Sequence, residues 1–211
     1  MKILMVEGIN DKFVIEKLLK RRKIEFDNFD ITDCHNVEKL LHILPETIQL
    51  RTYGEVIGVI VDADEDLAKR WQTLQGILRR AGYANIPQEP DTKGILLKDE
   101  NYELPQVGVW LMPNNQVNGR IEDFIRFLVP SDDDLLPIAE KTVDNLIALE
   151  KNRFSIPHKS KAIIHTWLAW QEKPGTQLGS AITYRVAKTQ EYILDDVNAS
   201  NFVEWLRKLF R

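Results

Sequence analysis

The stretch Val56-Ile57-Gly58-Val59-Ile60-Val61-Asp62-Ala63-Asp64-Glu65-Asp66 decides the fold expected for this chain. Its first six residues are valine or isoleucine apart from one glycine, which predicts a strand buried on both faces of a parallel sheet. Four acidic residues follow within the next five positions. In an open α/β sheet, ligands bind just beyond the carboxyl ends of the strands. The stretch therefore predicts a buried parallel strand with an acidic site at its end.

Strand geometry predicts how the acids are arranged. Residues two apart in a strand point to the same side, so we expect the carboxylates of Asp62 and Asp64 to share one side. The chain begins with a similar segment, Lys2-Ile3-Leu4-Met5-Val6-Glu7-Gly8, an apolar strand that ends in an acid. If the two strands are parallel neighbours, Glu7 joins the two aspartates.

Such a cluster is unfavourable without a counter-charge. At an effective dielectric constant near 20, two carboxylates about 5 Å apart repel each other by roughly 3 kcal/mol. The cluster therefore requires a cation or protonation. Because its ligands are all oxygens, the sequence favours Mg²⁺ or Mn²⁺ over zinc.

The order of the remaining elements predicts the fold class. Amphipathic helical patterns follow the first three predicted strands, which implies right-handed crossovers and a largely parallel sheet covered on both faces. The second strand, within 24–32, is expected near an edge of the sheet. Residues 94–98 and 107–112 predict a hairpin. We therefore expect an α/β, Rossmann-like core with a hairpin insertion and a mostly helical C-terminal extension.

The same order of elements predicts the domain organisation. We expect a core over residues 1–118 and a helical extension over 119–211 that packs on it as one continuous unit, because no Gly/Ser-rich linker separates them. Trp167, Trp170 and Trp205 are predicted core anchors. Ser131 and Asp134 have the spacing of a capping box before the next helix.

Composition excludes several classes of protein. No apolar run approaches 18 residues and the first predicted strand begins at Lys2, so we expect neither a membrane span nor a signal peptide. Cys34 is the single cysteine, which excludes a disulfide framework and favours a cytoplasmic protein. The net charge of -4 gives no global attraction to nucleic acid but leaves a local groove open.

The two acidic motifs together resemble the Toprim domain. They are Glu7-Gly8-Ile9-Asn10-Asp11 and, some fifty residues later, Asp62-Ala63-Asp64. Bacterial primases, topoisomerases, the overcoming-lysogenization-defect nucleases and small RNA-maturation nucleases share this domain. The chain looks most like the small stand-alone Toprim-like proteins of unknown function. The resemblance covers about residues 1–115.

This resemblance implies a metal-dependent phosphoryl-transfer enzyme, foremost a nuclease that acts on DNA or RNA. Glu7, Asp62 and Asp64 would hold Mg²⁺ or Mn²⁺, and Glu7 could instead act as the general base. Nuclease-type Toprim domains add a later acid, for which we select Glu122, and Asp66 is a further candidate ligand for a second ion.

Two lysines are the last catalytic candidates. Lys159 and Lys161 stand at the start of a predicted helix, where the helix dipole disfavours cations. They would stabilise charge on a transferred phosphate, as a lysine does in related nucleases. The alternative for both is a solvated helix face or an ion pair with the acidic cluster. Likewise, Asp66 and Glu122 could serve only to stabilise the starts of their own helices.

Other classes of function stay open beside the nuclease. A plain Rossmann-like scaffold with acidic loops is one, although it does not explain the convergence of acids. A non-catalytic Toprim-like module that binds a metal or nucleotide is another. Larger Toprim nucleases carry an ATPase domain that this chain lacks. As partners we therefore expect nucleic acid, together with a second copy of the chain or a separate ATPase, and no membrane.

Overall fold

The computed structural model describes residues 1–22, 29–181 and 196–211, and its first half alternates strands and helices. The strands are β1 (Lys2–Val6), β2 (Asp30–Asp33), β3 (Val56–Asp62), β4 (Ile95–Leu97) and β5 (Gln106–Met112). The helices of this half are α1 (Ile9–Arg21), α2 (Val37–Gln49) and α3 (Leu67–Arg80). Those that follow are α4 (Ile121–Leu128), α5 (Leu135–Ala148), the 3-10 turn η1 (Ile156–His158), α6 (Lys159–Ala169), α7 (Leu178–Ala181) and α8 (Val197–Phe210).

The strands form one sheet in the order β2-β1-β3-β5-β4. All neighbouring pairs are parallel except β4 with β5, which are antiparallel. The predicted α/β class, the largely parallel sheet and the hairpin are therefore confirmed. The predicted second strand is also at an edge, although residues 24–28 of its expected range lie outside the described residues.

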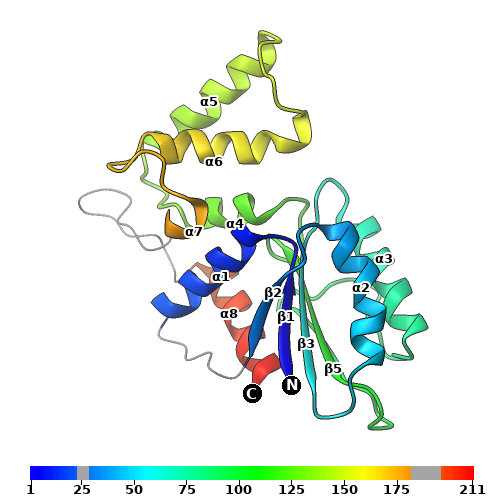
Figure 1. Cartoon of the computed structure of the whole chain (residues 1–211). Coiled ribbons are helices and arrows are strands. Elements are labelled where there is room, and N and C mark those ends of the chain that lie inside the picture. The colour runs from blue at the N-terminus through cyan, green and yellow to red at the C-terminus, as the bar shows by residue number, and fades with distance from the viewer. Residues whose placement is uncertain (23–28, 182–195) are drawn as a thin grey trace.

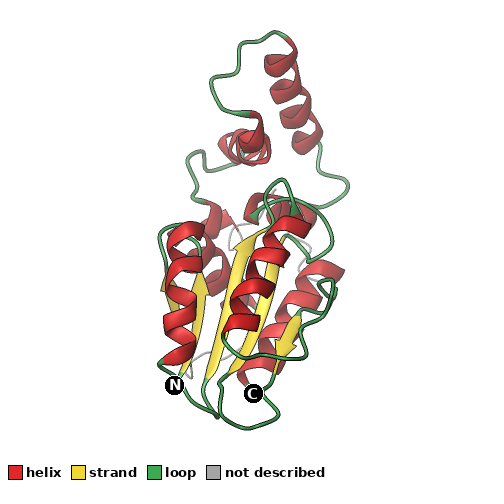
Figure 2. Ribbon diagram, turned by 90° about the vertical axis from the view of Figure 1, so that its right-hand side faces the viewer, coloured by secondary structure: helices red, strands yellow, loops and turns green. Residues whose placement is uncertain are grey.

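Two apolar cores lie on opposite faces of the sheet, in a three-layer arrangement (Figures 1 and 2). Helices α2 and α3 cover one face, and α1, α4 and α8 cover the other. Strand alternation divides the side chains between them: in β1, Leu4 and Val6 join one core, while Ile3 and Met5 join the other. This double burial explains why the strands consist of almost uninterrupted apolar residues.

Two paired glycines let α8 approach the sheet closely. Gly58 of β3 lies opposite Gly108 of β5. A Cβ atom on Gly108 would lie 2.6 Å from Leu209 Cδ2, so a larger residue there would push α8 away. Two hydrogen bonds fix the helix: Trp205 Nε1 donates to Ile95 O at 3.1 Å, and Lys2 Nζ donates to Phe210 O at 2.7 Å.

Helices α5 and α6 lie beyond the carboxyl ends of the strands (Figure 1). Of the three predicted core tryptophans, Trp167 and Trp205 are fully buried, as expected. The prediction for Trp170 is wrong, since its side chain is 40% exposed. Trp170 is the C-cap of α6, just beyond its last helical residue.

The predicted capping box before α5 is also replaced. Instead of Ser131 and Asp134, it is Asp133 that caps the helix. Its Oδ1 accepts the N–H groups of Leu135 at 3.0 Å and Leu136 at 2.7 Å. Any of the three consecutive aspartates could supply this acceptor, so spacing alone did not identify the right one.

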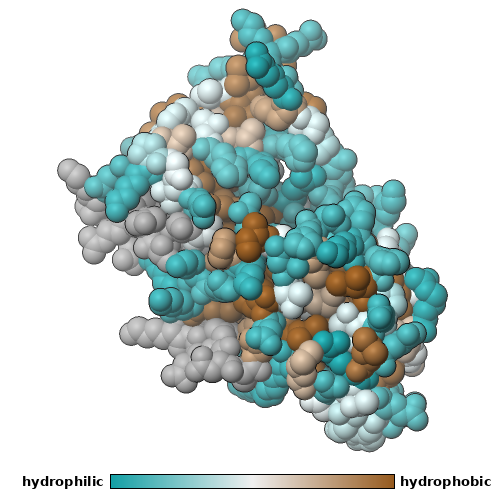
Figure 3. Space-filling view, in the orientation of Figure 1, coloured by the Kyte–Doolittle hydropathy of each residue, from teal (hydrophilic) through white to brown (hydrophobic). Residues whose placement is uncertain are grey.

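One face of the molecule carries its exposed apolar side chains mainly as small separate patches (Figure 3). On the face shown in Figure 3, hydrophilic side chains surround separate apolar ones over the described residues. Within the described ranges, no helix is both long and apolar enough to cross a membrane.

Candidate functional site

Four acidic side chains gather where β1 and β3 end. Asp62 is the last residue of β3, Glu7 follows directly after β1, and the two strands are parallel neighbours. The Asp62 N–H donates to Glu7 Oε1 at 2.7 Å. The first turns of α1 and α4 add Asp11 and Glu122, which are only 7% and 5% exposed and interact electrostatically with each other and with Asp62. The structure thus brings together Glu7, Asp62 and Glu122, and adds Asp11.

Backbone pairing places the start of α4 against the end of β3. Asp64 N–H donates to Gly119 O at 2.9 Å, and Gly119 N–H donates to Asp64 O at 2.8 Å. Gly119 has φ 144°, and a Cβ atom there would lie 2.7 Å from Asp123 Oδ2. Asp62 Oδ1 then accepts the Ile121 N–H at 3.0 Å. The Asp62 carboxylate therefore caps α4, and Glu122, the residue after Ile121, belongs to the cluster.

Burial and mutual repulsion raise the pKa values of these carboxyl groups. Burial is the main cause that raises the pKa of Glu7 from 4.5 to about 7, and the charges of Asp11 and Asp64 add to it. Burial likewise raises the pKa of Asp11 from 3.8 to about 6, with a contribution from Glu122. The pKa of Asp62 lies well above its usual value for the same two reasons. Near neutral pH the cluster therefore retains protons unless a cation is present.

Asp64 lies close to this cluster but is held differently. β3 ends at Asp62, and Asp64 has φ 54°, in the left-handed region. The strand alternation that predicted a shared side therefore does not reach Asp64. Its carboxylate is paired with two arginines: Arg70 Nη2 lies 2.5 Å from Oδ2, and Arg120 Nε lies 2.8 Å from Oδ1.

These two arginines line an open pocket of about 490 Å³, here called the arginine pocket. Lys69 and Thr73 of α3 line it too, and its three acids, Asp64, Glu65 and Asp66, balance its three basic side chains. Guanidinium groups bind carboxylate and phosphate oxygens in the same planar geometry. An anion in this pocket would therefore bind the two arginines in place of the Asp64 carboxylate, which pairs with them in this structure.

Asp66 is used at the start of α3. It is the N-cap residue of this helix, and its Oδ1 accepts the Lys69 N–H at 2.9 Å. This is the helix-start role that the sequence left open as the alternative to metal binding.

The two candidate lysines lie in the first turn of α6. Lys159 Nζ pairs with Asp144 Oδ1 of α5 at 2.6 Å, and Lys161 is exposed. The ion pair of Lys159 is thus with α5 and not with the acidic cluster. Between the lysines, Ser160 Oγ donates to Asp123 Oδ1 at 2.7 Å and joins α6 to the first turn of α4.

The donor set fits Mg²⁺ or Mn²⁺ by its chemistry, because it consists of carboxylate oxygens in a buried, repulsive cluster. Across residues 1–22, 29–181 and 196–211, however, no three His, Cys, Asp or Glu side chains are arranged to hold a metal ion as they stand. Glu7 and Asp62 each use one oxygen on a backbone N–H, which leaves one oxygen apiece for an ion.

Sequence reasoning did not select three residues of the site. Asp11 appeared within the first motif, and its position in the first turn of α1, four residues after Glu7, was a usable signal. Arg70 and Arg120 gave no such signal. Their roles depend on the left-handed turn at Asp64, which spacing does not reveal.

Comparison with known proteins identifies one family. The model of the DUF3226 family, described as a protein of unknown function, matches residues 1–211. No curated protein and no solved structure matches the chain.

Proposed function

We propose that this chain, which belongs to the DUF3226 family of proteins of unknown function, is a metal-dependent phosphoryl-transfer enzyme of the Toprim type, and specifically a nuclease that cleaves DNA or RNA. The observation that carries the proposal is the cluster of four carboxyl groups at the ends of β1 and β3, with raised pKa values for three of them. A protein gains nothing in stability from such repulsion, so the cluster is best explained by a cation that it binds.

The proposed ligands are Glu7, Asp62 and Glu122, with Asp11 beside them. A bound Mg²⁺ or Mn²⁺ would neutralise charge on the scissile phosphate and lower the pKa of the attacking water. Asp64 and Asp66 are not included, because the first is paired with two arginines and the second caps α3.

The residues of the chain itself support two further parts of the reaction. If Glu7 does not bind the ion, its pKa of about 7 suits a general base at neutral pH, and its Oε2, the oxygen that the Asp62 N–H does not use, would accept the proton of the attacking water. Arg70 and Arg120 would bind the substrate phosphate in the arginine pocket, where their present partner is the Asp64 carboxylate. The phosphate would replace that carboxylate as the acceptor.

One observation favours a second function. Two arginines already neutralise Asp64, and the described residues hold no ready-made metal site. A non-catalytic Toprim-like module would have this character, binding a metal or nucleotide only when a partner, such as a separate ATPase, completes it.

Calorimetric titration of Mg²⁺ and Mn²⁺ tests the proposal. It compares the wild type with Asp62→Asn, and uses Asp30→Asn as the control, because Asp30 is exposed at the start of β2. We expect binding in the wild type and the control and none in Asp62→Asn. Cleavage of single- and double-stranded DNA and RNA, with either metal, should show the same dependence. Metal binding without cleavage of any of these substrates would favour the module, and no metal binding would refute the enzyme.

A further inference from the structure

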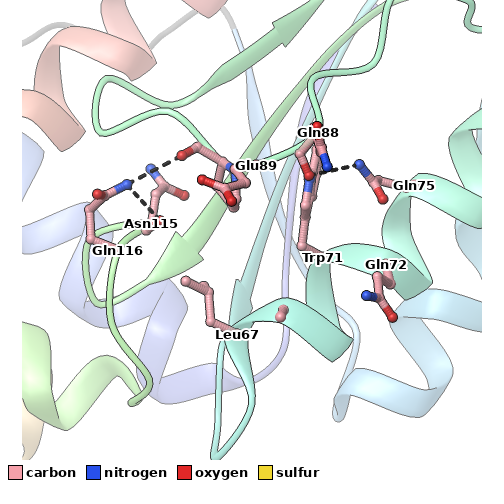
Figure 4. A pocket seen from close by; sticks show the side chains of 10 residues that line it. Leu67, Trp71, Gln72, Gln75, Gln88, Glu89, Asn115 and Gln116 are labelled. Atoms are coloured by element: carbon pink, nitrogen blue, oxygen red, sulfur yellow. Dashed lines mark hydrogen bonds between the residues drawn. The ribbon is translucent and has the colours of Figure 1, made fainter.

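A second pocket, of about 470 Å³, is lined by uncharged amides and is here called the amide pocket (Figure 4). Its volume falls within the range of about 300–1,000 Å³ typical of small-molecule sites. The amides come from α3 and from the two loops that follow α3 and β5: Gln72, Gln75, Gln88, Asn115 and Gln116. Among the described residues that line it, Glu89 alone is charged. The pocket therefore suits a neutral ligand and not a phosphate.

One amide of this pocket has a buried donor with no partner. Asn115 is fully buried, and its Oδ1 accepts the Leu111 N–H at 2.7 Å, which fixes the orientation of the side chain. Its Nδ2 is buried and has no hydrogen-bond partner within the described part of the chain. Buried donors are almost always paired, so this one indicates a ligand or water that accepts its hydrogen bond.

Gln75 contributes the complementary group. Its Nε2 donates to Pro87 O at 2.7 Å and to Gln88 O at 3.2 Å, which leaves Oε1 as the atom that can accept. Figure 4 shows Gln75 and Asn115 at opposite ends of the pocket, with Trp71 next to Gln75. The Trp71 indole is itself fixed, because its Nε1 donates to Gln88 O at 3.1 Å. The pocket is thus lined by an amide whose buried donor is unpaired within the described residues, a glutamine held by two backbone carbonyls and an aromatic wall.

We propose that the amide pocket binds a nucleobase of the substrate. A nucleobase is planar and uncharged, and its edge carries both acceptors and N–H donors, which asparagine and glutamine amides recognise. Aromatic side chains are common walls of such sites. The choice of a nucleobase among planar rings rests on the proposed function. The inference adds a base-binding subsite to the proposed phosphate-binding site.

The place of the pocket supports this assignment. Leu67 and Trp71 line the amide pocket, whereas Lys69 and Arg70 line the arginine pocket, so the two pockets flank the first turns of α3. Asn118 ties these turns to the loop after β5, since its Oδ1 accepts the Leu67 N–H at 2.9 Å. A nucleotide unit at this edge would therefore find the two arginines of one pocket and the uncharged amides of the other on either side of one helix.

Equilibrium dialysis with adenosine, guanosine, cytidine and uridine, in the presence of a chelator, tests the assignment. Ala68→Trp fills the pocket from an exposed helix position. Asn115→Asp keeps the acceptor for Leu111 N–H and tolerates the φ of 64°, but it removes the donor. We expect at least one nucleoside to bind the wild type, and both variants to weaken it by about tenfold or more. Gln49→Glu, exposed at the end of α2, should bind as the wild type does.

The outcome is independent of the acidic cluster. Asp62→Asn should lose metal binding and keep nucleoside binding, so a failure of the proposed function leaves the base site standing. Two results would overturn the base site: no nucleoside bound by the wild type at millimolar concentration, or binding that Ala68→Trp leaves unchanged in a variant shown by circular dichroism to be folded.

Discussion

Replacing Glu7 by glutamine should stabilise the metal-free protein at alkaline pH while it removes the proposed activity. Glutamine retains an oxygen that can accept the Asp62 N–H, so the hydrogen bond at 2.7 Å can persist. What disappears is a negative charge that burial and the neighbouring acids disfavour. The substitution therefore isolates the electrostatic cost of the site.

The size and sign of the effect follow from the pKa of Glu7. Because folding raises this pKa from 4.5 to about 7, the carboxyl group destabilises the protein progressively as the pH rises through that window. At pH 8 the loss amounts to about 3 kcal/mol, and at pH 5 to less than about 1 kcal/mol. Glu7→Gln should recover most of this free energy of unfolding at pH 8 and little at pH 5.

Urea unfolding at both pH values, with a chelator present, measures the difference. Glu103→Gln is the matched control, since Glu103 is exposed in the loop between β4 and β5. Repeating the pH 8 measurement with Mg²⁺ should stabilise the wild type more than Glu7→Gln. If Glu7→Gln raised the free energy of unfolding equally at the two pH values, or not at all at pH 8, repulsion within the cluster would not destabilise the folded protein and the reasoning would be refuted.

Four further substitutions test the fold and the contacts of Asp64 and Asp66 by the same unfolding measurement. Gly108→Ala should cost about 1–3 kcal/mol, because the new Cβ would lie 2.6 Å from Leu209 Cδ2; an unchanged midpoint would mean that α8 is not packed so closely. Asp64→Asn should lower the free energy of unfolding by about 1.5–3 kcal/mol, because it weakens two arginine contacts. Asp66→Asn should lower it by less than about 0.5 kcal/mol, because asparagine caps helices as well as aspartate does. Tyr83→Phe should cost about 1–3 kcal/mol, since the buried hydroxyl donates to a backbone carbonyl at 2.6 Å, and a loss below that range would indicate that water replaces it.

The fold was predictable where one local pattern sufficed. The apolar run from Val56 to Val61 predicted a strand buried on both faces, and β3 lies at the centre of the sheet. The position of α8 was not predictable in this way. Its pattern indicates an apolar face but not the surface that this face covers. Gly58 and Gly108 were the signal, because glycine inside a strand indicates a close approach of another element.

The candidate site was predictable only where regular geometry placed it. Parallel pairing of β1 and β3 was enough to bring Glu7 next to Asp62. The resemblance to Toprim nucleases suggested Glu122, which indeed lies against these acids. Asp64 differs because its left-handed backbone depends on pairing with Gly119, a contact between segments that are distant in sequence. No strand rule contains that information.

The close packing of α8 on Gly58 and Gly108 also affects the order in which the protein folds. The apolar side chains of β3 and β5 on that face are covered by residues 197–210, which a ribosome delivers long after the strands. Contacts this far apart in sequence slow folding, and until they form the nascent chain displays an open apolar surface to chaperones and proteases. Premature termination before residue 197 would therefore yield a chain with all five strands but without the helix that packs on Gly58 and Gly108, and cellular quality control would recognise the apolar surface left exposed there.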